Sequence, residues 1–597
     1  MNEAGRKYIF YGITLVIGLV LVFRLVQLQL FNQSVYGKES MSNSTKTITV
    51  VPPRGLMFDR NGKVVVDNRP SYSVMITKSQ FDTNQISEVA GFLQMEAQEI
   101  RDILKEVKGT NRFNPTRIKR DVEFPVISYI SENENRLIGV DYQVEAERFY
   151  PNDFSASHVF GYTKEISEKQ LKNQVGDYYK QGDIIGIKGI EKVYETYLRG
   201  EKGYNFIAVD VKGKEMGSVN DGRDDIAPVS GSDLHLSLDS KLQAYAEELM
   251  KNYKGAIIAM DPRNGEILCM VSKPDFDLGI FSGPTDKKVL SDLTTDPGKP
   301  LFNRATMTNY PPGSTWKMMM GLAGMGSGEI TPTSTIVCGG SFTYGNKTFG
   351  DHGSYGAINI VKALEKSSNV FFYKLVLQLG LDNYHKYGTI LGFGQKTGID
   401  ISDELPGRLP SEDYYNKVYG AGKWTKGYIV SLGIGQGELG VTPIQMVAHT
   451  SSIAMNGLYW QPHFVRKIVN STTGEDETPQ FNSRQIDLPL EYFEAVKKGM
   501  YLVVNGTGTA TNIKNKDYLL AGKTGTAQNP HGNNHSWFVG FAPFDDPQIA
   551  IVVMGEGAGW GASFGAPVGG ALMVRYLSGH SMDVFDPDSG NLMQVRD

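Results

Sequence analysis

The chain has 597 residues, of which 40% are hydrophobic and 21% are charged, and its formal net charge is -5 at pH 7. This length predicts several domains, and the composition is that of a globular protein rather than a disordered one. No basic run or RNA-binding motif occurs, which excludes nucleic acid as an expected partner, and two cysteines, Cys269 and Cys338, exclude a disulfide scaffold but leave one disulfide possible.

An uncharged apolar stretch, Tyr8 to Phe23, follows two basic residues near the N-terminus. Extended past Arg24 to Phe31, it is long enough for a membrane-spanning helix. A cleaved signal peptide is the alternative, but no small-residue cleavage site follows, which favours a retained anchor. The basic flank predicts a cytoplasmic N-terminus, so residues 1–31 are expected to form a short tail and a single-pass anchor with the body outside.

Residues 32–228 form a polar, strand-and-turn-rich zone. The segment "DRNGK" predicts a turn between two extended segments, in which Asn61 and Gly62 supply the positive φ that such a turn needs. Farther along, "GIKGIEKVYETYLRG" predicts a short helix closed by Gly200. Nucleophiles and metal ligands do not cluster in this zone, so a structural module is the preferred interpretation.

Residues 229–580 predict a body of helices beside an antiparallel sheet. A strand, a turn at Asp239 and a helix come first, and two strands follow over residues 255–274. A helix, a break and a second helix ending at Gly380 are expected next, and residues 517–557 read as three successive strands. Residues 581–597 form a polar tail, and the whole chain is expected to be a multidomain α+β protein.

Ser314 and Lys317 lie three residues apart in "YPPGSTWKMMMGLAGMGSG". Two prolines and a glycine precede them, so a helix is expected to begin near Ser314. Residues i and i+3 share one helix face, and a desolvated lysine has a lowered pKa that lets it take a proton from a serine hydroxyl. An N-cap serine with a surface lysine is the simpler interpretation, but no second Ser-x-x-Lys occurs in this chain.

Two further short motifs follow along the chain. "SSN", Ser367 to Asn369, lies in the predicted break between helices, where a hydroxyl and an amide can point into one cleft; a helix cap is the simpler interpretation. "KTGT", Lys523 to Thr526, lies on a predicted strand, where Gly525 leaves room for a substrate backbone. The looser patterns Ser-x-Asn and Lys-Thr-Gly also occur elsewhere in the chain, at Ser218, Ser589 and Lys396, so neither carries the argument alone.

The order Ser-x-x-Lys, Ser-x-Asn, Lys-Thr-Gly is typical of serine acyltransferases that bind penicillin. With its anchor, the chain resembles a class B penicillin-binding protein, a peptidoglycan D,D-transpeptidase. "NGTGTA" and "HSWFVGFAP" are more similar to the elongation branch, that of penicillin-binding protein 2, than to the division branch. The resemblance implies a β-lactamase-like transpeptidase domain on an elongated, strand-rich pedestal. The segments that carry it include "PPRGLMFDRNGK", "RFYPNDFSASHVFGY", "GIEKVYETYLRG", "NRATMTNYPPGSTWK", "LGIGQGELGVTPIQM" and "AGKTGTAQ".

The resemblance also implies roles for the motif residues. Ser314 would attack the carbonyl of the penultimate D-alanine of a stem peptide, and Lys317 would accept its proton. Ser367 would relay a proton to the leaving or entering amine, and Asn369 would hold the peptide amide.

The C-terminal motif is expected to bind the substrate. Lys523 would hold the terminal carboxylate of the stem peptide together with the neighbouring hydroxyls, and the backbone N–H groups of Ser314 and Thr526 would form the oxyanion hole. The substrate-binding residues are then Thr524, Gly525 and Thr526.

The implied partners are stem peptides, lipid-linked precursor strands, β-lactams, the bacterial inner membrane and a polytopic glycosyltransferase of the shape, elongation, division and sporulation family. No cofactor is expected. Some elongation-type relatives carry a metal site of Asp, His and Cys, but the spacing of Cys338, Asp351 and His352 does not match it cleanly, so no metal site is predicted.

Three alternatives remain open at this point. A serine β-lactamase would hydrolyse penicillin rapidly, which the size, anchor and pedestal argue against. A division-type transpeptidase shares the same three motifs. A non-enzymatic β-lactam sensor or scaffold of the wall-synthesis complex is the third, although the tail before the anchor, "MNEAGRK", is too short for a signalling domain.

Overall fold

The computed structural model divides into two compact units. One unit comprises residues 1–53, 72–145 and 200–230, and the other comprises residues 54–71, 146–199 and 231–597. The multidomain α+β class predicted from the sequence is confirmed, whereas the boundaries placed at residues 31, 228 and 580 stay predictions. The structure describes residues 3–27, 45–107, 114–173, 176–210, 215–283, 285–530, 532–580, 584–585 and 592–593.

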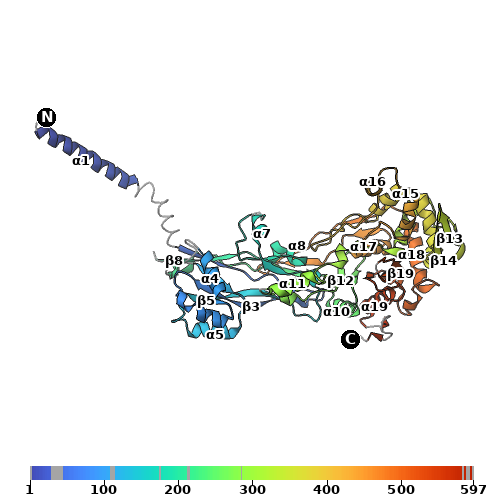
Figure 1. The fold of residues 1–597 in the computed structure, drawn as a ribbon, viewed down its shortest axis with the longest axis horizontal. Helices are drawn as coiled ribbons and strands as arrows, with labels where there is room; N and C mark the ends of the chain where they lie inside the picture. Colours follow the sequence, from blue (N-terminus) through green and yellow to red (C-terminus); the bar gives the residue numbers. More distant parts are fainter. Residues whose placement is uncertain are drawn as a thin grey trace. The chain divides into compact units, whose positions relative to one another are not determined.

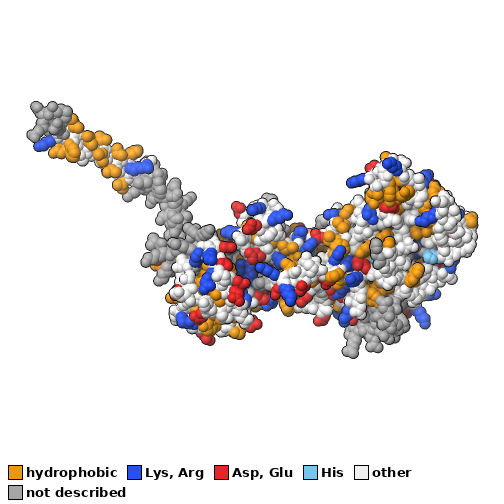
Figure 2. All heavy atoms as spheres, viewed as in Figure 1, with side chains coloured by type: hydrophobic (Ala, Val, Ile, Leu, Met, Phe, Trp, Pro, Cys, Tyr) orange, Lys and Arg blue, Asp and Glu red, His pale blue; other side chains and the backbone are white. Residues whose placement is uncertain are grey.

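Helix α1 (Glu3–Val26) contains the predicted anchor (Figure 1). Its segment Lys7–Val26 is long and apolar enough to cross a membrane, and Figure 2 shows apolar side chains along it. These side chains are exposed, as Leu15 at 68% and Phe23 at 71% illustrate. Exposed apolar surface of this extent is stable in contact with lipid or another helix rather than with water. The predicted extension to Phe31 lies outside the described residues.

The rest of the first unit is strand-rich. Strand β8 (Gly203–Val209) pairs antiparallel with β1 (Thr45–Val50) and with β9 (Glu215–Ser218). A separate core forms where the second half of β3 (Val64–Thr77) pairs with β4 (Pro115–Lys119). Helices α3 (Ile86–Leu93), α4 (Ala97–Glu106) and α5 (Phe124–Glu132) contribute their apolar faces to this core.

The second unit is built around a five-stranded antiparallel sheet. The strand order is β12-β11-β21-β20-β19, and every neighbouring pair is antiparallel, as predicted for the last three strands. The two strands predicted before them are also confirmed. Their bounds are β11 Gly255–Met260, β12 Ile267–Lys273, β19 Ala521–Ala527, β20 His535–Ala542 and β21 Ile549–Gly555.

Both faces of this sheet are covered, and its inner strands β11 and β21 carry no polar side chain at any position. Successive side chains point to opposite faces, so Ile258 belongs to the core that contains helix α17 (Pro443–Ala454). Its neighbour Ile257 belongs to the core that contains α10 (Ser240–Leu249) and α19 (Gly565–Ser578). Asp239 caps α10, as the predicted turn required. Burial of each aliphatic side chain away from water contributes about 2 kcal/mol to the free energy of unfolding.

The predicted pair of helices is α14 (Ile360–Lys366) and α15 (Asn369–Ile390). The expected end at Gly380 is a kink, because this glycine has a φ of 71° and a further helical segment continues to Ile390. An antiparallel hairpin of β13 (Ile336–Tyr344) and β14 (Lys347–Ile358), which sequence analysis did not predict, packs against α15 (Figure 1).

Two smaller expectations can also be compared with the structure. Both cysteines are free and buried, so the possible disulfide does not form. The polar tail, residues 581–597, lies mostly outside the described residues, apart from the short paired strands β22 (Val584–Phe585) and β23 (Leu592–Met593).

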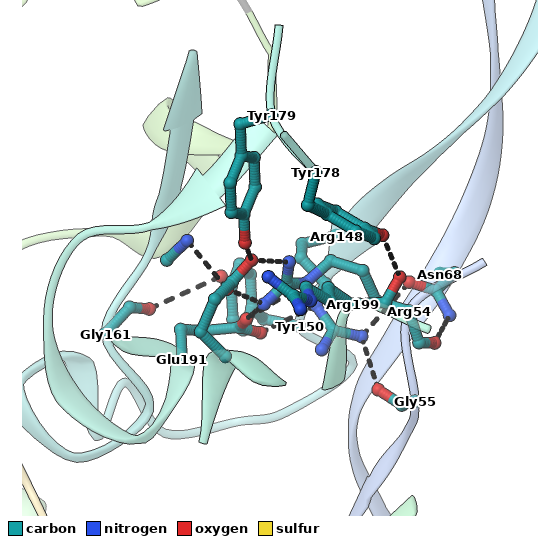
Figure 3. Close-up of polar contacts among 12 residues, drawn as sticks. Arg54, Gly55, Asn68, Arg148, Tyr150, Gly161, Tyr178, Tyr179, Glu191 and Arg199 are labelled. Atoms are coloured by element: carbon teal, nitrogen blue, oxygen red, sulfur yellow. Dashed lines mark hydrogen bonds and ion pairs between the residues drawn. The ribbon is translucent and has the colours of Figure 1, made fainter. Parts of the chain in front are cut away.

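A buried ion cluster joins three distant segments of the second unit (Figure 3). Arg54, which shortly precedes the turn at Gly62, lies 2.5 Å from Glu191 and 2.6 Å from Glu195. Arg148 donates to the other oxygen of Glu191 at 2.6 Å. Burial alone would raise the pKa of Glu191, but the two guanidinium groups lower it below its ordinary value. The carboxylate of Glu191 therefore stays ionised and compensates two buried cations.

Glu191→Ala removes the carboxylate and leaves the buried Arg148 without its ion-pair partner, while Arg54 keeps Glu195. We expect the free energy of unfolding to fall by about 3–5 kcal/mol, because an uncompensated buried charge costs far more than a surface pair contributes. Urea unfolding of the wild type and variant in detergent measures the difference. Glu248→Ala, which removes an exposed partner of Lys251, is the control and should cost less than about 1 kcal/mol. Equal losses would contradict the interpretation.

Candidate active site

Ser314 lies on a turn of 3₁₀-helix, Gly313–Trp316, that leads into helix α13 (Lys317–Gly326). The predicted helix start is therefore present, with a tighter first turn. Gly313 has a φ of 57°, and a Cβ added there would lie 2.6 Å from the carbonyl oxygen of Thr526 and 3.0 Å from its nitrogen. Only glycine permits this approach, and it brings the backbone of Ser314 beside strand β19.

Lys317 is fully buried, and its ammonium group reaches the second motif. Its Nζ donates to Asn369 Oδ1 at 2.7 Å, to the Ser367 carbonyl at 2.7 Å and to Ser367 Oγ at 3.3 Å. Within the described residues Nζ forms these three bonds and none to Ser314. Burial, followed by repulsion from Lys523, lowers the pKa of Lys317 well below its ordinary value, while Asp351 opposes the shift.

Ser367 occupies the break between α14 and α15. It has left-handed backbone angles, φ 54° and ψ 36°, which are uncommon for a residue with a side chain and mark local strain. This conformation turns the chain between the two helices, so that both its oxygen atoms face Lys317. Ser368, the next residue, caps α15 through its side chain. The helix-cap interpretation therefore holds for Ser368, while Ser367 and Asn369 contact the buried lysine.

Asp351 is a residue whose role sequence analysis missed. It lies on β14, and its carboxylate accepts from Ser368 Oγ at 2.6 Å and from the backbone N–H groups of Asn369 at 2.7 Å and Val370 at 2.9 Å. A carboxylate at a helix N-terminus satisfies free N–H groups and complements the helix dipole. In the sequence, Asp351 is only an acid that precedes the second motif, and its spacing from Cys338 and His352 does not fit a metal site.

Lys523 is the second buried ammonium group. Its Nζ donates to Ser367 Oγ and to the Thr524 carbonyl, both at 3.0 Å, and burial lowers its pKa to about 7. A Cβ at Gly525 would lie 2.7 Å from the Pro312 carbonyl oxygen, so this glycine admits the turn before Ser314 against the strand. Strand β19 therefore packs against the turn that carries Ser314, and its residues Thr524, Gly525 and Thr526 also line the cleft.

The three motifs line one cleft of about 480 Å³. Thr524 Oγ1 lies 2.5 Å from Thr509 Oγ1, which belongs to the "NGTGTA" segment. Gln436 donates to the Thr526 carbonyl at 3.2 Å. Several other residues of the lining have no site role predicted from the sequence. They are Lys347, Phe349, His352, Tyr373, Ser431, Gln528, Asn534 and Trp560.

The possible metal ligands have other contacts. The Cys338 thiol contacts the Ile336 carbonyl at 3.5 Å, and burial raises its pKa, which disfavours the thiolate that a metal needs. The Asp351 carboxylate accepts hydrogen bonds at the N-terminus of α15. Burial lowers the pKa of His352. In the part of the chain that the structure describes, no three His, Cys, Asp or Glu side chains are grouped so as to hold a metal ion.

Comparison with known proteins places these features in a family. Residues 255–574 match the family described as the penicillin binding protein transpeptidase domain, and residues 49–236 match the penicillin-binding protein dimerisation domain. The chain is 32% identical over 585 residues to the peptidoglycan D,D-transpeptidase MrdA of Acinetobacter baumannii, an alignment that covers 94% of this chain and 85% of the relative.

Solved structures of penicillin-binding proteins have a similar fold. The penicillin-binding protein PBP2 of Helicobacter pylori in its complex with MreC has a TM-score of 0.78 and 29% identity, covering 90% of this chain and 100% of that one. A chain from a structure titled as the structural coordination of polymerization and crosslinking by a peptidoglycan synthase complex has a TM-score of 0.69 and 26% identity, covering 96% and 98%.

The lowered pKa of Lys523 predicts a pH-dependent cost to folding. Between about pH 7 and pH 10 the unfolded chain, whose lysine has an ordinary pKa near 10.4, binds a proton that the folded chain does not. The free energy of unfolding therefore rises with pH in this window, by at most about 1.4 kcal/mol per unit. Lys523→Met removes this contribution.

Urea unfolding at pH 7.5, 8.5 and 9.5 checks the sign. The wild type minus Lys523→Met difference should rise with pH by about 1 kcal/mol per unit. Lys251→Met, which removes an exposed lysine, is the control and should show no such trend. A difference that stays flat or falls would show that Lys523 keeps its proton in the folded chain.

Proposed function

Because this chain belongs to the penicillin-binding proteins, on the PBP2 branch, we propose that it is a serine-type peptidoglycan D,D-transpeptidase that acts in cell elongation and shape maintenance. One observation carries the mechanism. Lys317 is buried, has a strongly lowered pKa, and lies one helical turn from a half-buried serine that lines the cleft. A neutral amine in this position is a suitable base for Ser314.

Acylation begins when Ser314 Oγ attacks the carbonyl carbon of the penultimate D-alanine. Its proton passes to Lys317 Nζ, and an ester bond forms. The peptide C–N bond then breaks, and the leaving D-alanine nitrogen receives a proton through Ser367 Oγ. Ser367 suits this relay because its hydroxyl lies 3.3 Å from the Nζ of Lys317 and 3.0 Å from that of Lys523.

The substrate is held by strand β19. Lys523 and the hydroxyls of Thr524 and Thr526 bind the terminal carboxylate, and Gly525 lets the peptide backbone approach the strand. The N–H groups of Ser314 and Thr526 form the oxyanion hole, which is supported by the close approach of Gly313 to the Thr526 backbone. Donors placed in advance around a developing oxyanion are a large contribution to acyl transfer.

In the second half-reaction an amine of a neighbouring stem peptide attacks the ester. The new C–N bond forms, the C–Oγ bond breaks, and the proton lost by the amine returns to Ser314 through the lysine. Water in place of the amine would give a D,D-carboxypeptidase side reaction. Rapid penicillin hydrolysis is not favoured, because no Asp or Glu lines the described cleft to activate water. β-Lactams therefore remain on Ser314.

The anchor suggests where the enzyme acts and with what partner. We place α1 in the bacterial inner membrane, with a cytoplasmic N-terminus and the catalytic unit outside, because the basic residues precede the apolar segment. A polytopic glycosyltransferase of the shape, elongation, division and sporulation family is the proposed partner. Support comes from the similarity to a chain of a peptidoglycan synthase complex.

Ser314→Ala tests the nucleophile. Intact-mass analysis after incubation with a fluorescent penicillin should show one adduct on the wild type and none on the variant, since Ser314 is the proposed nucleophile. Ser327→Ala, at the end of the same helix and outside the cleft lining, is the control and should keep the adduct. An adduct that survives the Ser314 change would identify another nucleophile.

Deletion of residues 1–31 tests the anchor. The truncated chain should still be acylated by penicillin, because the cleft is built entirely from the second unit. It should no longer retain the glycosyltransferase in a pull-down from detergent-solubilised membranes. Retention equal to that of the full chain would show that the pairing does not depend on the anchor.

A further inference from the structure

Two neighbouring residues of the segment "LGIGQGELG", residues 432–440, contact both sides of the proposed oxyanion hole. The Gly435 carbonyl accepts from the Gly313 N–H at 3.0 Å. The next residue, Gln436, donates from its side-chain Nε2 to the Thr526 carbonyl at 3.2 Å. Gly313 directly precedes the proposed nucleophile, so the two contacts reach the two backbone segments whose N–H groups would hold the oxyanion.

Gln436 binds the end of strand β19 at an edge of the sheet. This strand has β20 as its one neighbour in the described five-stranded sheet, so its other edge needs partners from elsewhere. The Gln436 amide provides one for Thr526. Because a carbonyl oxygen accepts and does not donate, the amide nitrogen of Gln436 faces this carbonyl. The Thr526 hydroxyl is held as well, since its Oγ1 accepts from the Gly561 N–H at 3.3 Å.

The backbone of this segment is fixed on both sides of the glutamine. Before it, Gly435 has a φ of 71° and ends the 3₁₀-helix η7 (Lys426–Ile434), and a Cβ there would lie 2.2 Å from the Gly313 carbonyl oxygen. After it, the Glu438 carboxylate accepts from two tyrosine hydroxyls of α16 (Glu412–Tyr419), at 2.8 Å and 2.6 Å. The side chain between these two anchors therefore starts from a fixed backbone.

An oxyanion hole works only when both of its donors reach the same oxygen atom. The donors stabilise the charge that develops as the serine attacks, and they do so without moving during the reaction. Here one donor, Ser314, lies on a 3₁₀ turn, and the other, Thr526, lies on a strand. Gly435 holds the first segment and Gln436 the second, and the peptide bond between these two residues limits how far apart the contacts can move.

We propose that Gln436 is a positioning residue for acyl transfer, which holds the Thr526 N–H at the distance from the Ser314 N–H that the oxyanion requires. This inference rests on the proposed transpeptidase function and adds to it a residue outside the three motifs, one that also lines the cleft. A side chain that merely filled space, or that bound the substrate away from the reacting carbonyl, would not act on the oxyanion.

The test compares two donor substrates on the full-length protein in detergent. One is an N-acyl-D-alanyl ester, and the other is its thionoester, in which sulfur replaces the carbonyl oxygen. Sulfur is a larger atom and a weaker hydrogen-bond acceptor than oxygen, so a correctly spaced oxyanion hole favours the ester. The ratio of kcat/KM for the ester to that for the thionoester reports the spacing of the donors, and it does not depend on the fraction of protein that is folded.

The wild type should favour the ester, and Gln436→Met, which removes the amide donor, should lower the ratio about tenfold. Gln436→Glu keeps the shape of the side chain, but a carboxylate cannot donate to a carbonyl, so the ratio should fall by a similar factor. Gln395→Met is the matched control. The Nε2 of Gln395 also donates to a backbone carbonyl, that of Thr389 at 3.2 Å, but it lies outside the cleft lining, so this variant should keep the wild-type ratio.

Failure of the positioning role and failure of the proposed function give different results. A wild-type ratio in both Gln436 variants would overturn the positioning role. A ratio that falls in Gln436→Met but not in Gln436→Glu would assign the effect to packing and would overturn it as well. In both cases the penicillin adduct on Ser314 still supports the proposed function. A wild type that forms no adduct would overturn the proposed function and the positioning role together.

Discussion

Two lysine side chains share one serine hydroxyl at the centre of the candidate site. The Nζ atoms of Lys317 and Lys523 lie 3.3 Å and 3.0 Å from Ser367 Oγ, and both lysines are fully buried. Burial disfavours each ammonium charge, and for Lys317 the repulsion from Lys523 adds to it. Two charged ammonium groups are therefore disfavoured at this place, and the Ser367 hydroxyl lies between the two lysines.

Close backbone approach keeps this arrangement together. Gly313 and Gly525 lie where the turn before Ser314 meets strand β19, and any side chain at either position would overlap the backbone opposite. The second contact is Asp351, which binds the first turn of α15 and so orients Asn369 toward Lys317. Three motifs separated by up to about two hundred residues thus meet through backbone contacts that side-chain motifs alone do not reveal.

In the ion cluster of the same unit, by contrast, buried charges are paired with opposite charges. Glu191 is matched by Arg54 and Arg148, so each charge there has a partner at short range (Figure 3). At the candidate site the two lysines contact hydroxyl, amide and carbonyl groups instead of carboxylates. Charges that are compensated stabilise a fold, whereas charges left uncompensated have displaced pKa values and are typical of reaction centres.

The sequence by itself determined the apolar N-terminal helix, the five core strands, the helices around the second motif and the identity of the motif residues. These features depend on local patterns, namely apolar length, alternation, and Gly, Pro and cap residues, which act within a few positions of the chain. The order of the three motifs added the resemblance to penicillin-binding proteins. That Ser367 and Asn369, and not Ser368, contact Lys317 could not be read from the triplet.

Only the tertiary structure decided where the protons of Lys317 are directed, that Asp351 supports the second motif, and that Lys347 lines the cleft. The hairpin of β13 and β14 is polar and glycine-rich, so it lacks the apolar alternation that predicts a strand. The helix expected to end at Gly380 continues beyond a kink, because packing against the core compensates the glycine. Burial and contact between distant segments set these features, and neither is encoded in a short window of sequence.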